Sequence, residues 1–200
     1  MASLRKFPFS FGVGTDICRI PRIYSLLTKN RGVNFVRRVL TQEEINAVRA
    51  SSKVLEPVFH EFKPSSNDSN GERDRQYHLA ILDAARFMAG RWAAKEAVIK
   101  ACNIYRVTFH DITITYEHQL AKSLRNKGSS SHPMAEQSPS PSDSQEIEKP
   151  RQTSPPVAVI KGHGTGDMYG RLSISHDGDY AVATCVTFWG EPDDDVSGVD

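Results

Sequence analysis

The segment from Ile81 to Cys102 constrains the fold more than any other part of this 200-residue chain. It is rich in Ala, Arg, Lys and Glu, it contains no proline, and Gly90 is its one glycine. These residue types favour the α-helix over nearly the whole segment. We therefore predict one long helix here, against which the rest of the chain must pack.

Segments that resemble strands lie on both sides of this helix. Residues 9–17 combine Phe, Val and Ile with the run Gly12-Val-Gly-Thr-Asp16, which predicts a strand that ends in a glycine turn. Four segments that we predict to be strands follow the helix, at 107–116, 157–161, 172–176 and 180–188, and the last alternates small and β-branched residues. Between the last two, His176-Asp-Gly-Asp179 predicts a hairpin turn.

Two shorter helices are predicted before the long one, over residues 20–27 and 34–50. Within the second, Thr41 and Glu44 have the spacing of a capping box, in which each side chain bonds the backbone N–H of the other residue. Strand, helices, long helix and then several strands indicate the α+β class. We expect a mostly antiparallel sheet packed on the long central helix.

Residues 123–156 differ in composition from the rest of the chain. Fifteen of these 34 residues are Ser or Pro, and the segment holds four apolar side chains, Leu124, Met134, Ala135 and Ile147. It cannot bury enough apolar surface to offset the entropy lost on ordering. We predict a single domain over residues 1–200, with a disordered insert here and a shorter polar loop at 63–76.

Charge and hydropathy argue against two broad classes of function. The 25 Lys and Arg residues nearly balance the 24 Asp and Glu residues, which leaves a net charge of +1. A nucleic-acid binder normally carries a clear basic excess. No apolar run approaches the roughly 18 residues of a membrane-spanning helix. We expect no nucleic-acid partner and no membrane partner.

Four charged residues project from the otherwise apolar second half of the long helix. Arg91 and Lys95 are one turn apart, and so are Glu96 and Lys100, so each pair lies on its own stripe of the helix. One interpretation of Glu96 and Lys100 is a surface ion pair, which stabilises a helix by about 0.2–0.5 kcal/mol. The other is a charged functional site on a central helix.

Asp16 also has two interpretations. Asp commonly caps a helix, and a predicted helix follows it. A carboxylate at the end of a strand can instead bind Mg²⁺, which uses one or two carboxylates together with substrate phosphates. Glu96 is the candidate second carboxylate, and the sequence leaves open whether the two side chains meet.

His176 follows Ser173-Ile-Ser175, next to the predicted hairpin turn. A histidine in this position is commonly structural or simply exposed. The Gly-x-Ser-x-Gly elbow of serine hydrolases does not accompany it, which argues against a Ser/His nucleophile.

In their order along the chain, four runs resemble the holo-acyl-carrier-protein synthases, the short type of 4′-phosphopantetheinyl transferase. The runs are Gly12 to Asp16, Arg38 to Glu44, Phe87 to Ala97, and Ser173 to Ala181. The third, Phe-x-Ala-x-Arg-Trp-Ala-x-Lys-Glu-Ala, is the most specific. The resemblance implies the fold of that family and an Mg²⁺-dependent reaction. In that reaction 4′-phosphopantetheine moves from coenzyme A to a serine of an apo acyl carrier protein, adenosine 3′,5′-bisphosphate is released, and the carrier is activated for fatty acid synthesis.

The resemblance also implies roles for individual residues. Asp16 and Glu96 would bind Mg²⁺. Four cations would surround the coenzyme A phosphates: Arg91, Lys95, Lys100 and His176. As a mechanistic hypothesis beyond the resemblance, we expect Glu96 to accept the proton of the carrier serine, directly or through a metal-bound water, and Lys100 to stabilise or protonate the departing phosphate. Phosphoryl transfer depends on positioning and charge neutralisation, which these residue types supply.

Partners and location follow from the same resemblance. Arg19 and Arg22 would form a docking patch for an acidic carrier protein, the alternative being an ordinary solvated basic face. Short-type enzymes are typically homotrimers with sites between subunits. The Ser/Pro insert suggests a fungal member that serves a mitochondrial carrier protein. Together with Arg5 and Lys6 near the N-terminus, this favours the mitochondrion, the alternative being the cytoplasm.

The chain departs from the family in one place, and two other functions remain open. Many relatives have a Gly-Thr-Gly turn just after the long helix, whereas residues 102–106 here read Cys-Asn-Ile-Tyr-Arg. The first alternative is a catalytically inactive carrier-binding module of the same fold, whose sign would be the loss of one acid; Asp16 and Glu96 are both present. The second is a nucleic-acid or phosphoprotein-binding module, which the balanced charge opposes.

Overall fold

The structure, a computed structural model, describes residues 10–29, 31–60, 71–102, 106–120, 154–162 and 166–188. Its elements are β1 (Phe11–Arg19), α1 (Ile20–Leu27), α2 (Gly32–Val39), α3 (Gln42–Ser51), α4 (Glu56–Phe59), α5 (Glu72–Ala101), the 3₁₀ turn η1 (Phe109–Asp111), β2 (Ile112–Tyr116), β3 (Pro156–Ile160), β4 (Met168–Asp177) and β5 (Tyr180–Phe188). No helix in these ranges is long and apolar enough to cross a membrane.

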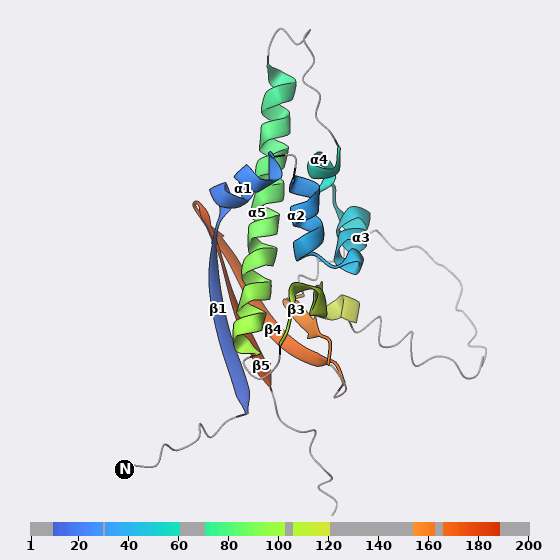
Figure 1. The fold of residues 1–200 in the computed structure, drawn as a ribbon, viewed down its shortest axis with the longest axis vertical. Coiled ribbons are helices and arrows are strands. Elements are labelled where there is room, and N and C mark those ends of the chain that lie inside the picture. Colours follow the sequence, from blue (N-terminus) through green and yellow to red (C-terminus); the bar gives the residue numbers. More distant parts are fainter. Residues whose placement is uncertain are drawn as a thin grey trace, which may run out of the picture.

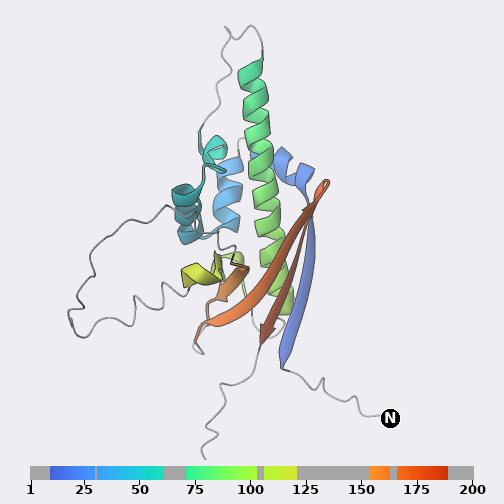
Figure 2. The ribbon, with the colours of Figure 1, turned by 180° about the vertical axis from the view of Figure 1, so that it is seen from behind.

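The five strands form one antiparallel sheet in the order β1-β5-β4-β3-β2. Strands β4 and β5 form the predicted hairpin, and Gly178 in its turn has a φ of 50°. Helix α5 packs along the sheet, and α2, α3 and α4 lie on the other side of α5 from β1 (Figures 1 and 2). The predicted α+β class, with an antiparallel sheet on a long helix, is confirmed.

Small residues let the long helix approach the sheet closely. The buried positions of α5 are mostly alanines: Ala84, Ala85, Ala89, Ala93, Ala94, Ala97 and Ala101. Opposite them on β1, a Cβ at Gly14 would lie 2.0 Å from the carbonyl oxygen of Ala97. A side chain at position 14 would therefore push β1 away from α5.

The predicted turn at Gly12–Asp16 is wrong. Strand β1 continues through this run, which pairs with residues 187–183 of β5. The glycine at position 14 serves close packing rather than a turn. Asp16 therefore lies inside a strand and does not cap α1, whose N-cap is Arg19.

The long helix starts at Glu72, nine residues before the predicted start. The predicted polar loop is therefore wrong for residues 72–76, and residues 63–70 lie outside the described part of the chain. Glu, Arg and Gln are polar but form helices well. In addition, Glu72 and Asp74 place negative charge at the positive end of the helix dipole.

Other boundaries shift less. The helix predicted at 20–27 and the strand predicted at 180–188 are confirmed. The single helix predicted at 34–50 is instead two helices, α2 and α3, separated by Leu40 and Thr41. The break coincides with the predicted capping box of Thr41 and Glu44, which forms. Strand β2 starts five residues later than predicted, after η1. Of the predicted insert, residues 123–153 lie outside the described ranges, and Pro156 already belongs to β3.

Candidate active site

The close packing of β1 on α5 brings Asp16 to Lys100. The Nζ atom of Lys100 donates to Oδ1 of Asp16 over 2.7 Å and to the carbonyl oxygen of Thr15 over 3.0 Å. The Asp16 side chain is 17% exposed and that of Lys100 is 50% exposed. Two residues that are 84 positions apart thus form an ion pair open to solvent.

Glu96 lies within electrostatic reach of this pair. Burial raises the pKa of its carboxyl group above the ordinary value of a glutamate, and the negative charge of Asp16 raises that pKa further. The positive charges of Lys100 and Arg22 act in the opposite direction. The charges of Asp16, Lys100 and Arg22 thus all act on the Glu96 carboxyl group.

This donor set fits a magnesium ion that is shared with a phosphate substrate. Mg²⁺ prefers oxygen ligands and is usually held by one or two carboxylates plus substrate phosphates and water. Asp16 and Glu96 supply two such carboxylates. Among the described residues, no group of three or more His, Cys, Asp or Glu side chains could hold a metal on its own.

A cavity of about 540 Å³ opens beside Glu96. It is lined by Arg38, Trp92, Glu96, Thr108, Phe109 and His110. The Trp92 ring stacks on Phe35 with centroids 5.8 Å apart, and it meets Phe109 edge-on at 4.9 Å. Glu96 therefore faces a space with an aromatic wall and a basic rim.

The two predicted docking cations lie at the end of β1 and the start of α1. The Arg22 guanidinium lies over the Trp92 ring, 5.4 Å from its centroid, and donates to Sγ of Cys18 over 3.7 Å. Arg19 is exposed at the last position of β1. Arg22 thus borders the Glu96 cavity, because it contacts one of the residues that line it.

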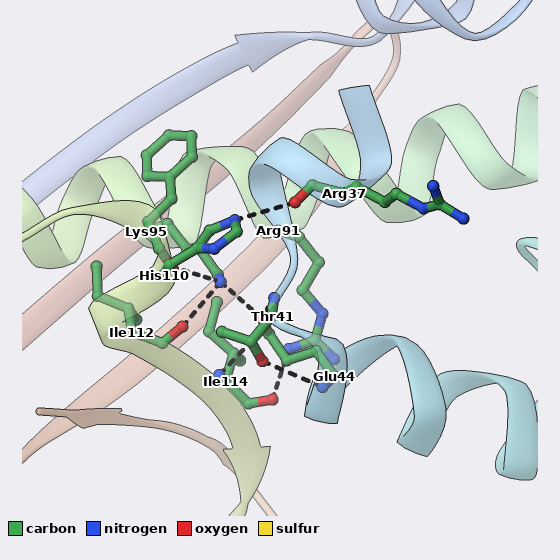
Figure 3. A network of polar contacts seen from close by, with 9 residues as sticks. Arg37, Thr41, Glu44, Arg91, Lys95, His110, Ile112 and Ile114 are labelled. Carbon is green, nitrogen blue, oxygen red and sulfur yellow. Dashed lines mark hydrogen bonds and ion pairs between the residues drawn. The ribbon is translucent and has the colours of Figure 1, made fainter. Parts of the chain in front are cut away.

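The other predicted stripe of α5 points into the protein (Figure 3). The Lys95 side chain is 0% exposed, and its Nζ atom donates to Oε2 of Glu44 over 2.6 Å and to the carbonyl oxygens of Phe109 and Ile112 over 2.9 and 2.8 Å. An ammonium group has three protons, so every one is used. The prediction that Lys95 contacts coenzyme A phosphates conflicts with this burial.

Arg91 shares the inward stripe but is only half-buried. Its guanidinium donates to the carbonyl oxygen of Ile114 over 3.3 Å and lies 5.1 Å from the centroid of the Phe87 ring. Desolvation lowers its pKa, and the charge of Glu44 opposes that change. Arg91 also lines a second cavity, between α3 and β2, so it can still receive an anion there.

His176 lies near an earlier part of α5 than Glu96 does. Its Nε2–H donates to the carbonyl oxygen of Arg86 over 3.0 Å, and a Cβ at Gly90 would come within 3.0 Å of the same nitrogen. These contacts are six and ten residues before Glu96, or about 9–15 Å along the helix axis. Within one chain, His176 is therefore separate from Asp16, Glu96 and Lys100.

Several residues at the site had no predicted role. Trp92 fell among the apolar residues of the predicted long helix, and Phe109 and His110 fell within a predicted strand. Trp92 precedes Glu96 by four positions, a spacing that places both on one side of a helix and could have indicated a shared surface. The run at 103–105, where the chain departs from the Gly-Thr-Gly of many relatives, lies outside the described residues.

Comparisons with known proteins find similarity over most of the chain. A sequence model described as the 4′-phosphopantetheinyl transferase superfamily matches residues 12–185. The "4′-phosphopantetheinyl transferase B, mitochondrial" of Aspergillus fumigatus is 29% identical over 188 residues, which cover 90% of this chain and 95% of that relative. A holo-[acyl-carrier-protein] synthase of a Geobacillus species is 32% identical over 178 residues, which cover 88% and 93% of the two chains.

Among solved structures, a holo-(acyl-carrier-protein) synthase from Bacillus anthracis, crystallised with CoA (3′,5′-ADP), is also similar. It is 22% identical, with a TM-score of 0.47, and the match covers 90% of this chain and 96% of that one.

Proposed function

Because the chain belongs to the 4′-phosphopantetheinyl transferase superfamily, we propose that it transfers 4′-phosphopantetheine from coenzyme A to a serine of an apo acyl carrier protein. The second product is adenosine 3′,5′-bisphosphate. The observation that carries the proposal is the ion pair of Asp16 and Lys100, whose charges act on Glu96, together with the cavity that Glu96 lines. Two carboxylates and a half-exposed lysine are the groups that a metal-dependent attack on a diphosphate requires.

The proposed step forms one bond and breaks another. The serine Oγ bonds to the phosphorus that carries pantetheine, and the bond from that phosphorus to the bridging diphosphate oxygen breaks. Glu96 accepts the serine proton, a task that suits a carboxyl group whose pKa is raised. Lys100 stabilises or protonates the departing phosphate. Asp16 and Glu96 would hold Mg²⁺, which when bound neutralises charge on the diphosphate.

We assign the remaining phosphate contacts to Arg91, Lys100 and His176, and not to Lys95. Lys95 is excluded because its three protons are used inside the protein. Arg91 and His176 are separate from the Glu96 site within one chain. They would reach coenzyme A if the site were completed by a second copy of the chain.

A homotrimer with sites between subunits accounts for this separation and for the exposed face of the sheet. The side chains on β1 and β5 that face away from α5 are largely apolar and more than one-third exposed: Val13, Ile17, Val182, Val186 and Phe188. Contiguous apolar surface of this kind commonly marks a protein interface. Analytical ultracentrifugation tests this assembly, and a monomer at micromolar concentration would contradict it.

We extend the proposal to the carrier partner and to the location. Arg19 and Arg22 would attract an acidic carrier protein, because rim charges steer association. The Aspergillus fumigatus relative carries "mitochondrial" in its name, which supports a mitochondrial location. The activated carrier would serve fatty acid synthesis, the role that the resemblance to holo-acyl-carrier-protein synthases implies. The cytoplasm remains the alternative, and imaging of a tagged full-length chain distinguishes the two.

One assay tests the function. The protein is incubated with coenzyme A, Mg²⁺ and apo acyl carrier protein, and intact-mass spectrometry follows the carrier. We expect the mass increment of phosphopantetheine, and we expect EDTA to abolish it. The alternative function, an inactive carrier-binding module, would bind the carrier without any mass increment. No increment in the presence of every component would contradict the proposal.

A further inference from the structure

One side of the Glu96 cavity is formed by residues 106–111, which are called the wall below. This segment buries little apolar surface of its own. Thr108, Phe109 and His110 line the cavity, and the only regular structure between residues 106 and 111 is the single 3₁₀ turn. None of these six residues is fully buried. Val107 and Phe109 pack against the core but are only partly buried, so the polar contacts that anchor this wall also help to fix its position.

One of these contacts leads to a buried ion pair, which also bonds the strand β2 that follows the wall (Figure 3). Lys95 holds the carbonyl oxygens of Phe109 and Ile112. Its partner Glu44 accepts the backbone N–H of Ile114 on Oε1 over 3.1 Å, and Oε2 accepts both Lys95 and the backbone N–H of Thr41. The pair thus connects the start of α3, the middle of α5 and the chain from η1 into β2.

A second anchor acts on the same wall from α2. The Nε2–H of His110 donates to the carbonyl oxygen of Arg37 over 2.9 Å. The wall is therefore bonded on one side to the residue next to Glu96 in sequence, and on the other side to the helix that carries Arg38. A change in the ion pair would move the wall relative to Glu96.

We propose that Lys95 and Glu44 are positioning residues for the transferase reaction. They set the distance between the aromatic wall and Glu96, and so the orientation of the serine hydroxyl group that enters between them. The inference rests on the proposed function for its consequence in catalysis. It gives Lys95 an essential role without any contact with coenzyme A, in contrast to the role that the family resemblance implies.

The central experiment is the kinetics of Lys95→Met. Methionine keeps the length of the side chain and removes the three donors. A misplaced wall should lower kcat by roughly 10- to 100-fold, since errors of about 1 Å have effects of this size. The KM for coenzyme A should change by less than about 3-fold. A tenfold rise in that KM with kcat retained would overturn the proposal, because it would make Lys95 a ligand of coenzyme A.

A matched control separates positioning from loss of stability. Ile81 is fully buried in the same helix, about four turns before Lys95, so Ile81→Ala weakens packing without touching the wall. We expect folded Ile81→Ala to keep its kcat. If Lys95→Met behaves in the same way, its role is only structural. Glu44→Gln, which keeps the size of the side chain, is the second test variant and is expected to show the same loss of kcat as Lys95→Met.

Trp92 provides a readout that needs no turnover. Its ring contacts Phe109 on the wall, and Trp189 is the other tryptophan of the chain. In a Trp189→Phe background, Trp92 emission should shift in Lys95→Met and Glu44→Gln but not in Ile81→Ala. Unchanged emission in the first two would overturn the proposed control of the wall. A wild-type chain without transferase activity would instead refute the proposed function, while the emission still tests the wall.

Discussion

The two charged stripes of α5 have the same spacing and opposite environments. Lys95 is 0% exposed and bonds only protein atoms, whereas Lys100, five positions later, is 50% exposed and pairs with Asp16. The buried lysine has no proton left for a ligand. Lys100 is half-exposed, so one side of its ammonium group stays open to a ligand. The difference teaches that two lysines of one family motif can have unlike environments, and that the face of the helix they occupy decides which of them a ligand can reach.

The largest effect should come from Glu96→Gln, on the exposed stripe of α5 that Glu96 and Lys100 form. It removes the proposed proton acceptor and one proposed metal ligand while keeping the shape of the side chain. We expect at least a 10³-fold lower kcat, or about 4 kcal/mol, at saturating coenzyme A and Mg²⁺. Intact-mass time courses measure it, with exposed Glu43→Gln on α3 as the control. Activity retained in Glu96→Gln would remove Glu96 from the site.

The two lysines should differ most in their effect on stability. Lys95→Met leaves Glu44 charged and buried, which costs about 3–5 kcal/mol of unfolding free energy. Lys100→Met breaks a solvent-exposed pair and should cost less than about 1 kcal/mol. Urea denaturation of both variants measures the difference. Equal losses would show that the contrast between the stripes has no energetic basis.

Gly14→Ala should disturb the close packing of β1 on α5 that brings Asp16 to Lys100. The added methyl group would meet backbone atoms of α5, and such overpacking costs about 1–3 kcal/mol. Because Asp16 would move away from Lys100, kcat should also fall. Gly170→Ala is the matched control: its Cβ would meet only side chains, those of Cys185, Thr187 and Ala158. Equal kcat in the two variants would argue against a role for Gly14 at the site.

The sequence allowed prediction of features that depend on local contacts. The capping box of Thr41 and Glu44 spans three positions and was predicted. The other partners of Glu44, Lys95 and Ile114, are 51 and 70 positions away, and no local pattern indicates them. A shared site of Asp16 and Glu96 was expected from family resemblance alone, since the place of Asp16 beside α5 depends on the pairing of β1 with β5 and on the packing of β1 against α5.

Charge reversal at Arg19 and Arg22 should produce a smaller effect, limited to the carrier protein as substrate. In Arg19→Glu/Arg22→Glu, repulsion of an acidic carrier should raise its KM by roughly tenfold, about 1.4 kcal/mol. The KM for coenzyme A should stay the same. Arg19→Glu alone separates docking from catalysis, because Arg22 also contacts Trp92 and its charge acts on Glu96. Equal changes in both KM values would contradict a docking patch.

The smallest effect is a dependence of stability on pH at Glu96. The pKa of this group is higher in the folded protein than the unfolded value of 4.5, because it is partly buried and close to Asp16. Its favourable contribution is therefore fully present below pH 4.5 and is lost as the pH rises through the folded pKa. Glutamine resembles the neutral acid, so Glu96→Gln should match the wild type in acid and exceed its stability at pH 7. The urea midpoints of the two proteins across this pH range measure the difference. Titrating groups that the two proteins share contribute equally to both and cancel in the comparison. A wild type more stable than the variant at pH 7 would mean that Glu96, like Lys95, is held for the fold and not for a ligand.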